Sequence, residues 1–320
     1  MKYIFKISMA LASLMFFSGC GHRGIDRAYN TEKHNSIYYW KTTFDISPTE
    51  MEFLKKHDIE RLYVRMFDVA IEQNLLSETK EVVPIATTKF VSEVPTNLEL
   101  VPVTYITIDA LRAMAGKEYD FATLIVERLL AMSSYNNCGE IKEIQLDCDW
   151  TSTTKSSYSK LCQRVKDLLH FKGIDLSITI RLHQLQETAP PADRGVLMLY
   201  NTGALKNPDT TNSILNINDV KPYIKSKKYS LPLDYAYPTF GWGVKFVNGK
   251  FVSIVSEESR PTSKEERIRH ERPTSIEILD VKRLVESKLG KPERGNIIYH
   301  LDDSQLKNYT NNEIAKILSY

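Results

Sequence analysis

The clearest alternation of hydrophobic and polar positions covers residues 141–151, Ile-Lys-Glu-Ile-Gln-Leu-Asp-Cys-Asp-Trp-Thr. Successive side chains of a β-strand point to opposite faces, so one face is apolar and the other carries Asp147 and Asp149 near its end. Apolar residues then recur at intervals of three and four from Tyr158 to Leu169, a spacing that is typical of an amphipathic helix. The stretch therefore predicts a strand, a tip with two acids, and a helix.

The same succession of strand and helix patterns continues along most of the chain. The other predicted strands are 37–44, 61–69, 82–86, 100–106, 174–182, 196–200, 230–242 and 295–301. The other predicted helices are 48–57, 108–113, 120–132, 218–227, 276–289 and 311–318. Right-handed crossovers between such strands produce a parallel sheet covered by helices. We expect an α/β fold, a closed TIM (β/α)8-type barrel. A doubly wound open sheet is the alternative, but no glycine-rich phosphate loop favours it.

A small β-hairpin is predicted near residues 246–252, where Asn248 and Gly249 provide the turn between two apolar runs. It interrupts the succession of strands and helices, so we expect an insertion over the mouth of the barrel. Residues 257–273 are charged and punctuated by proline, which indicates a solvated loop.

The first residues have the pattern of an export signal. Lys2 and Lys6 precede an apolar run over 7–17, which is too short to span a bilayer. Phe17-Ser18-Gly19-Cys20 resembles the lipobox of bacterial lipoproteins. That resemblance implies cleavage before Cys20 and attachment of lipid, palmitate included, to its sulfur. A plain secretory peptide is the alternative.

Three segments follow from this signal: a signal peptide at 1–19, a polar tether at 20–36 and the barrel domain at 37–320. The lipid would anchor the protein to the membrane rather than span it, so we expect a place in the bacterial cell envelope, at the outer or inner membrane. No later stretch is apolar enough to form a second membrane segment.

Composition excludes one class of partner. Without Lys2 and Lys6 the chain has 42 − 2 = 40 basic residues against 40 acidic ones, so no net charge favours nucleic acid. Three cysteines remain after Cys20, and we expect Cys148 and Cys162 to be buried free thiols, with one disulfide as the alternative. No metal-ligand spacing or cofactor motif is visible. We expect a monomer.

Two acids facing inward at a strand tip predict hydrolytic chemistry on sugars, because the C-terminal strand ends of a barrel form the active-site mouth. Asp149 is the predicted general acid, and Asp147 on the same face is expected to tune its proton affinity. Asp234, Asp302 and Asp303 are candidates for the second catalytic group, unless the substrate itself assists. Acids at strand ends also form turns and cap helices, and that structural role is the alternative.

Aromatic and basic side chains are the candidate substrate contacts. Aromatic rings stack on the apolar faces of sugars, and the candidates for this role are Tyr200, Tyr237 and Trp242. The same rings suit a packed core equally well. The candidate cations are Arg65 and Arg181. Ion pairs between these arginines and the two acids would favour a protein without catalytic activity. His183 follows a predicted strand and is expected at the rim more than in catalysis.

The Ile144–Thr151 stretch, Ile-Gln-Leu-Asp-Cys-Asp-Trp-Thr, and the helix after it resemble a bacterial lipoprotein family of glycoside-hydrolase-like TIM barrels, classed as a domain of unknown function. A more distant similarity is to chitinase-type barrels, which carry Asp-x-Asp-x-Glu on the fourth strand and Met-x-Tyr on the sixth. Gln145-x-Asp147-x-Asp149 stands in the first pattern, and Met198-Leu199-Tyr200-Asn201 resembles the second. The family's proton donor is Glu, and the shorter Asp149 stands there instead. Shifting the pattern to start at Asp147 puts Thr151 at the donor position.

The resemblance implies a lipid-anchored glycoside hydrolase that acts on a poly- or oligosaccharide by carboxylate general acid catalysis. The alternative is a non-catalytic carbohydrate-binding or scaffold lipoprotein on a degenerate barrel, which would account for the missing Glu. A third hypothesis is a structural protein of the envelope with no glycan ligand.

Overall fold

The computed structural model describes residues 33–73, 80–225 and 228–320. The predicted signal peptide, Cys20 and the tether as far as residue 32 lie outside the described residues. Strand β1 (Asn35–Tyr39) begins inside the range expected for the tether. In the part of the chain that is described, no helix is both long and apolar enough to cross a bilayer.

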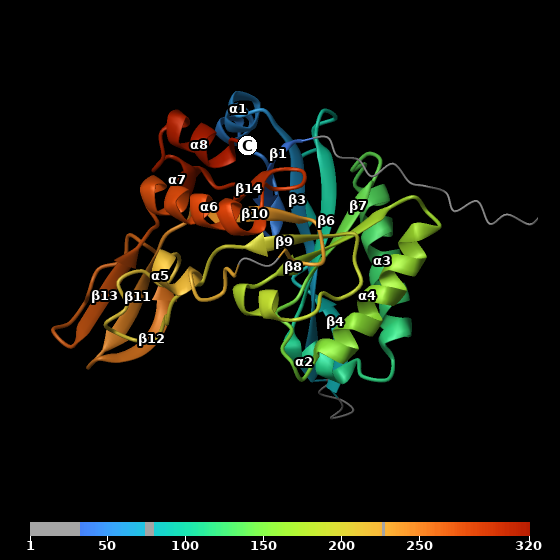
Figure 1. Cartoon of the computed structure of the whole chain (residues 1–320), viewed down its shortest axis with the longest axis horizontal. Coiled ribbons are helices and arrows are strands. Elements are labelled where there is room, and N and C mark those ends of the chain that lie inside the picture. The colour runs from blue at the N-terminus through green and yellow to red at the C-terminus, as the bar shows by residue number, and fades with distance from the viewer. Residues whose placement is uncertain (1–32, 74–79, 226–227) are drawn as a thin grey trace, which may run out of the picture. The chain divides into compact units, whose positions relative to one another are not determined.

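Eight parallel strands form a closed barrel, which confirms the predicted TIM-type fold (Figure 1). Around the barrel they are β1, β3 (Ile59–Gln73), β6 (Glu99–Ile106), β7 (Glu143–Asp147), β8 (Asp175–Ile180), β9 (Arg194–Met198), β10 (Leu233–Pro238) and β14 (Asn296–Tyr299). Strand β1 pairs with both β14 and β3, and this pairing closes the ring.

One predicted barrel strand lies outside the ring. Strand β4 (Lys80–Ile85) pairs antiparallel with the second half of the long strand β3, so the chain returns along β3 instead of crossing over the barrel. A parallel connection needs a dozen or more residues, usually with a helix, and the interval between β3 and β4 is too short for one. The short strands β2 (Thr43–Phe44) and β5 (Lys89–Phe90) pair with each other.

The helices pack outside the strands, and their ends follow the capping signals. Helix α1 (Pro48–Lys56) begins after Ser47, whose hydroxyl accepts from the backbone N–H of Glu50 in a capping box. The other helices are α2 (Ile108–Ala113), α3 (Glu118–Tyr135), α4 (Lys155–His170), η1 (Leu182–Gln186), α5 (Ile217–Val220), α6 (Ser275–Leu289), α7 (Asp303–Leu306) and α8 (Asn311–Leu318). Helix α5 is shorter than the predicted helix over 218–227, which contains Pro222.

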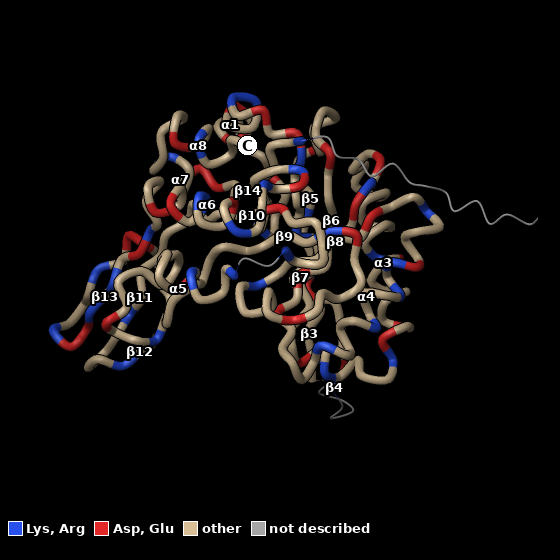
Figure 2. Tube along the Cα trace, viewed as in Figure 1, with Lys and Arg blue, Asp and Glu red and all other residues tan. Residues whose placement is uncertain are grey.

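The predicted hairpin is part of a larger insertion between β10 and α6. Strands β11 (Trp242–Val247) and β12 (Lys250–Val255) form the hairpin, and β13 (Glu266–Glu271) pairs with β11 on the other side. The prediction of a solvated loop over residues 257–273 was therefore wrong for its second half. Charged residues of both signs lie along β13 (Figure 2), and two ion pairs hold three of them, Glu266 with Lys245 and Arg269 with Glu271.

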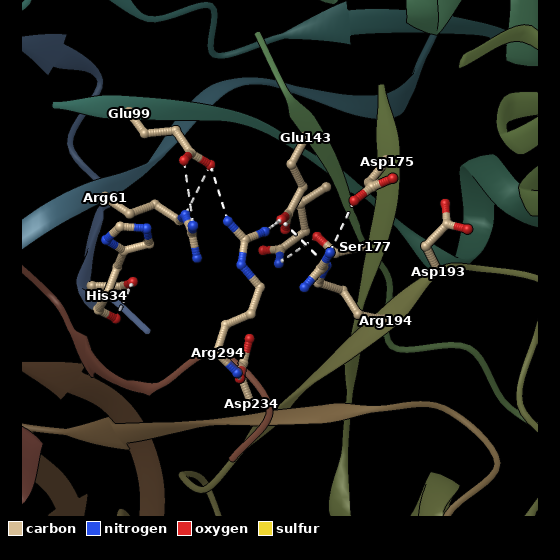
Figure 3. A network of polar contacts seen from close by, with 12 residues as sticks. His34, Arg61, Glu99, Glu143, Asp175, Ser177, Asp193, Arg194, Asp234 and Arg294 are labelled. Atoms are coloured by element: carbon tan, nitrogen blue, oxygen red, sulfur yellow. Dashed lines mark hydrogen bonds and ion pairs between the residues drawn. The ribbon is translucent and has the colours of Figure 1, made fainter. Parts of the chain in front are cut away.

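The interior of the barrel is polar near the N-terminal strand ends. Three arginines, Arg61, Arg194 and Arg294, lie among carboxylates there (Figure 3). Arg294 Nη1 donates to Glu143 Oε2 over 2.7 Å, and Arg61 Nε donates to Glu99 over 2.9 Å. Arg61, Arg294 and Glu143 are buried, and each of these charges needs its partner because little water reaches it. The network fills one end of the barrel, and the opposite end is where a cavity opens.

Candidate functional site

A cavity of about 410 Å³ opens where the barrel strands end, beside the last residue of β7. Its walls come from residues that end or follow β1, β6, β7, β8, β9 and β14. The lining residues are Trp40, Tyr105, Asp147, Asp149, Arg181, Leu182, His183, Met198, Tyr200, Asn201, Thr202, Tyr223 and Tyr299. The two acids of the opening motif therefore share one hollow at the C-terminal strand ends.

Asp147 is the deeper of the two acids and is held in place by its neighbours. Its side chain is 4% exposed. Its Oδ1 accepts from Thr179 Oγ1 over 2.6 Å and from Arg181 Nη2 over 3.1 Å. Both partners come from β8 and its end, next to β7 in the sheet, so strand pairing fixes the position of the carboxylate.

Asp149 lies two residues beyond, past the end of β7, and its side chain is 48% exposed. Its Oδ1 is nonetheless shielded from solvent and has no hydrogen-bond partner. The side-chain nitrogens nearest to Oδ1 are Arg181 Nε at 3.9 Å and His183 Nε2 at 4.0 Å. Both distances exceed hydrogen-bond length, so Asp149 remains available for chemistry.

Arg181 connects the two acids to the aromatic wall. Its Nη1 donates to the hydroxyl of Tyr200 over 3.2 Å, and its guanidinium lies 5.5 Å from the centre of the Tyr200 ring. Burial, the largest single influence, would lower the pKa of Arg181, but Asp147, Tyr200 and Asp149 together outweigh it, and the pKa is raised well above its usual value. Arg181 is therefore a permanent cation in the cavity.

The aromatic side of the cavity is a connected cluster of rings. Tyr299 lies 4.7 Å from Tyr200 and 5.8 Å from Trp40, measured between ring centroids. Burial raises the pKa of Tyr105, Tyr200 and Tyr299, so these phenols stay neutral and offer hydroxyl groups rather than charges. Such a wall suits a ligand with apolar faces and hydroxyl edges.

Five of the predicted site residues do not line this cavity: Asp234, Asp302, Tyr237, Trp242 and Arg65. Asp234 lies at the opposite end of the barrel, where its Oδ1 accepts from the backbone amides of Arg294 and Gly295. Burial raises the pKa of Asp234 to about 7. Its position follows from the strand itself, because Asp234 is the second residue of β10 and parallel strands all begin at the same end.

The other four have structural contacts that explain their places. Asp302 caps helix α7 and Arg65 pairs with Asp68, with Arg65 Nε to Asp68 Oδ1 at 2.7 Å. Tyr237 is fully buried in the cluster between the strands and the helices. Trp242 starts β11, and its indole N–H donates to Glu271. Asp303, the further candidate, accepts from Ser47 and does not line the cavity either.

Sequence reasoning missed several cavity residues. Trp40 and Tyr299 stand just after or at the end of β1 and β14, and Tyr105 is close to the end of β6. Their common signal is an aromatic residue at a strand end, which can be seen only once the strand bounds are known. No group of three or more His, Cys, Asp or Glu among the described residues could hold a metal ion.

The loop after β9 provides the rim residues Asn201 and Thr202, and the insertion holds this loop. The backbone N–H of Thr202 donates to the carbonyl of Ile214 over 3.3 Å, so the loop folds back on itself. Its far side carries Ser213, whose hydroxyl donates to the buried carboxylate of Glu271 on β13. Arg269 and Trp242 also donate to Glu271, so one carboxylate joins the insertion to the rim of the cavity.

Comparison with known proteins adds the fold relationship. No protein-family model matches the sequence, and no curated protein matches it. Solved structures match over most of the chain. The fold is that of the chitinase-type barrels.

Three of these structures show how far the likeness extends. A chitinase from Chromobacterium violaceum ATCC 12472 has a TM-score of 0.55 and 10% identity, covering 89% of this chain and 98% of that one. The Bacillus megaterium QM B1551 spore cortex-lytic enzyme SleL has a TM-score of 0.54 and 13% identity, covering 90% and 74%. Catalytic domain 2 of the Ostrinia furnacalis Group II chitinase, in complex with penta-N-acetylchitooctaose, has a TM-score of 0.51 and 12% identity, covering 89% and 95%. At such identities the likeness concerns the fold.

Proposed function

We propose that the protein is a glycoside hydrolase that acts on a poly- or oligosaccharide, with its acid chemistry centred on Asp149. The observation that carries this proposal is the state of the Asp149 carboxylate. It is half-exposed in an aromatic-lined cavity, and its Oδ1 has no hydrogen-bond partner. An acid with a purely structural role, such as Asp302 at its helix cap, has its donors in place.

Asp147 has a different role from Asp149. The guanidinium of Arg181 and the hydroxyl of Thr179 hold it as a fixed anion. A fixed carboxylate stabilises the positive charge that develops at the anomeric carbon when a glycosidic bond breaks. No third carboxylate is among the residues that line the cavity. The second catalytic group is therefore Asp147 itself or a group of the substrate.

The test is the variant Asp149→Asn against a panel of polysaccharides, with chitin oligosaccharides included because a fold neighbour binds one. Products are followed by mass spectrometry. We expect the variant to lose about 100-fold or more of the rate, since general acid catalysis contributes at least that much. Its melting temperature should not fall, because the exposed carboxylate has few contacts to lose.

Asp58→Asn is the matched control. Asp58 is exposed in the turn before β3, far from the strand ends that form the cavity, and its φ of 47° suits Asn as well as Asp. This control should keep full activity. If Asp149→Asn also keeps full activity, Asp149 is not the centre of the chemistry.

A second candidate function is a non-catalytic carbohydrate-binding protein. The observation in its favour is the Arg181 guanidinium, which lies within 4 Å of carboxylate oxygens of both cavity acids. This hypothesis predicts that a chitin oligosaccharide binds without cleavage over days, and that Tyr200→Ala weakens binding in calorimetry. Detectable cleavage products that disappear in Asp149→Asn would exclude it.

We also propose that the chain is a lipoprotein of the bacterial cell envelope, anchored through Cys20. The support is the lipobox-like Phe17-Ser18-Gly19-Cys20 after a short apolar run. In a bacterial host, the wild-type chain should take up labelled palmitate and sediment with membranes, and Cys20→Ser should do neither. Membrane association of Cys20→Ser equal to that of the wild type would refute the anchor.

A further inference from the structure

The unpartnered Oδ1 of Asp149 has two N–H groups within reach. They are Arg181 Nε at 3.9 Å and His183 Nε2 at 4.0 Å. Hydrogen bonds of catalytic groups are often long in an empty site and shorten when substrate binds. A small rotation of either side chain would complete the hydrogen bond, so the two candidates differ mainly in what each can do chemically.

Arg181 is already committed and cannot release a proton. Its Nη2 donates to Asp147 and its Nη1 donates to Tyr200. Its pKa is raised well above the usual value, against the effect of burial, mainly by the charge of Asp147. Arg181 therefore fixes the geometry of the cavity and stays charged through any reaction.

The remaining ionisable groups of the cavity leave one side chain suited to proton transfer near neutral pH. Those facing Asp149 and His183 are Asp147, Arg181, Tyr105, Tyr200, Tyr223 and Tyr299. Burial raises the pKa of three of these phenols, Tyr105, Tyr200 and Tyr299, so the pKa of each lies further above neutral pH. Asp147 is enclosed by its two donors. His183 is 50% exposed in the same cavity, and imidazole is the side chain whose charge changes between pH 5 and 8.

We propose that His183 is the proton donor of this site and that Asp149 is the carboxylate that orients it. The inference rests on the proposed function, and it names the atom from which the proton leaves. Nε2 of His183 faces Asp149, so Nδ1 of the imidazolium is the N–H left for the oxygen of the leaving group. A carboxylate paired with imidazolium stabilises its charge and fixes its ring, which is the arrangement of a general acid dyad.

Hydrolysis of the glycosidic bond by this route needs no reactant other than the substrate and water. The bond between the anomeric carbon and the glycosidic oxygen breaks, and its electron pair stays on that oxygen. The oxygen takes the Nδ1 proton of His183 and leaves as a hydroxyl. Water then forms the new bond to the anomeric carbon and releases a proton, and the half-exposed imidazole recovers a proton from solvent. Asp149 stays ionised throughout.

Substrates with different leaving groups test this assignment. A sugar alcohol leaves poorly and needs a proton, whereas 2,4-dinitrophenolate leaves without one. His183→Gln should lower kcat/KM about 100-fold for an unactivated oligosaccharide and less than about 3-fold for the 2,4-dinitrophenyl glycoside of the same sugar. Asp149→Asn should show the same selectivity. His183→Ala should regain activity on the unactivated substrate when imidazole is added, which a structural role would not produce.

His270→Gln is the matched control, because His270 is exposed on β13, outside the cavity. It should behave as the wild type with both substrates. If His183→Gln slows both substrates equally, or imidazole does not rescue His183→Ala, the donor assignment fails while the hydrolase proposal stands. If the wild type releases neither leaving group from any glycoside of the panel, the proposed function fails and this inference fails with it.

Discussion

Replacing Arg181, the cation beside Asp147 and Asp149, should destabilise the fold because Asp147 then keeps its charge without its ion-pair partner. Arg181 Nη2 lies 3.1 Å from Asp147 Oδ1, and the two side chains are only 18% and 4% exposed. In Arg181→Met the Asp147 carboxylate keeps the Thr179 hydroxyl as its one hydrogen-bond donor. Breaking a buried ion pair by removing one partner costs about 3–5 kcal/mol, because the remaining charge is not compensated. We expect a loss of about 3 kcal/mol in the free energy of unfolding.

The double variant Arg181→Met with Asp147→Asn separates this effect from lost packing. It removes both charges, so its loss should be only about 1–2 kcal/mol and smaller than that of Arg181→Met alone. With a loss of about 1 kcal/mol for Asp147→Asn alone, the coupling energy between the two positions should be about 2–3 kcal/mol, within the range of about 0.5–3 kcal/mol found for residues in one network.

Urea denaturation followed by both circular dichroism and tryptophan fluorescence measures these free energies, and coincident transitions establish that unfolding has two states. Arg283→Met is the control. Arg283 and Asp280 form an ion pair with 73% and 41% exposed side chains, and such a change should stay within about 0.5 kcal/mol of the wild type. A loss below about 1 kcal/mol in Arg181→Met, or simple additivity in the double variant, would refute the reasoning.

Three further predictions concern buried groups that do not line the cavity. The pKa of Asp234 is raised by burial to about 7, so the folded chain keeps a proton that the unfolded chain loses near pH ~4. Its contribution to stability falls by about 1.4 kcal/mol per pH unit between these values, and pH-dependent urea denaturation should show a flatter profile in Asp234→Asn. Burial raises the pKa of Cys138, Cys148 and Cys162, all free thiols, so mass spectrometry should find none of them labelled by a thiol reagent before unfolding. Glu271→Gln should cost on the order of 2 kcal/mol in urea denaturation, and a change below ~0.5 kcal/mol would contradict its linking role.

Much of the fold could be predicted because local signals and packing agree. The helices over 108–113 and 311–318 have the predicted bounds, and α1 begins at residue 48, where the helix over 48–57 was predicted to begin. Cys148 and Cys162 are buried and free, as predicted from their apolar faces. Strand β13 was missed because its polar residues are satisfied by partners elsewhere in the chain, and no local pattern reveals those partners.

The site was predicted in part, and the errors concern the end of the barrel and the strand face on which a residue lies. Asp147, Asp149, Arg181 and Tyr200 were identified and do line the cavity, although their catalytic and binding roles stay predictions. A period of two shows which face of a strand a residue occupies, but it does not show at which end of the barrel the residue lies. The prediction for Asp234 is an error of that kind, because this residue lies at the end of the barrel opposite the cavity.

The face can be wrong as well when the strand bounds are uncertain. Along β10, Ala236 points into the barrel and Tyr237 points toward the helices. The predicted strand over 230–242 was longer than the observed Leu233–Pro238, and two of its aromatic residues, Tyr237 and Trp242, were predicted to contact substrate together. Four of the aromatic residues that line the cavity, Trp40, Tyr105, Tyr200 and Tyr299, lie at or just beyond the ends of four other strands, and the closed barrel brings them together.

The link between Glu271 and Ser213 joins positions 58 residues apart in the chain. One end of this link lies in a sheet that contributes no residue to the lining of the cavity, and the other end lies in the loop that carries Thr202 at its edge. Substitutions in that outlying sheet can therefore change the width of the opening while the barrel strands and the acids between them remain as they are. Selection for a new ligand would have a place to act outside the barrel strands.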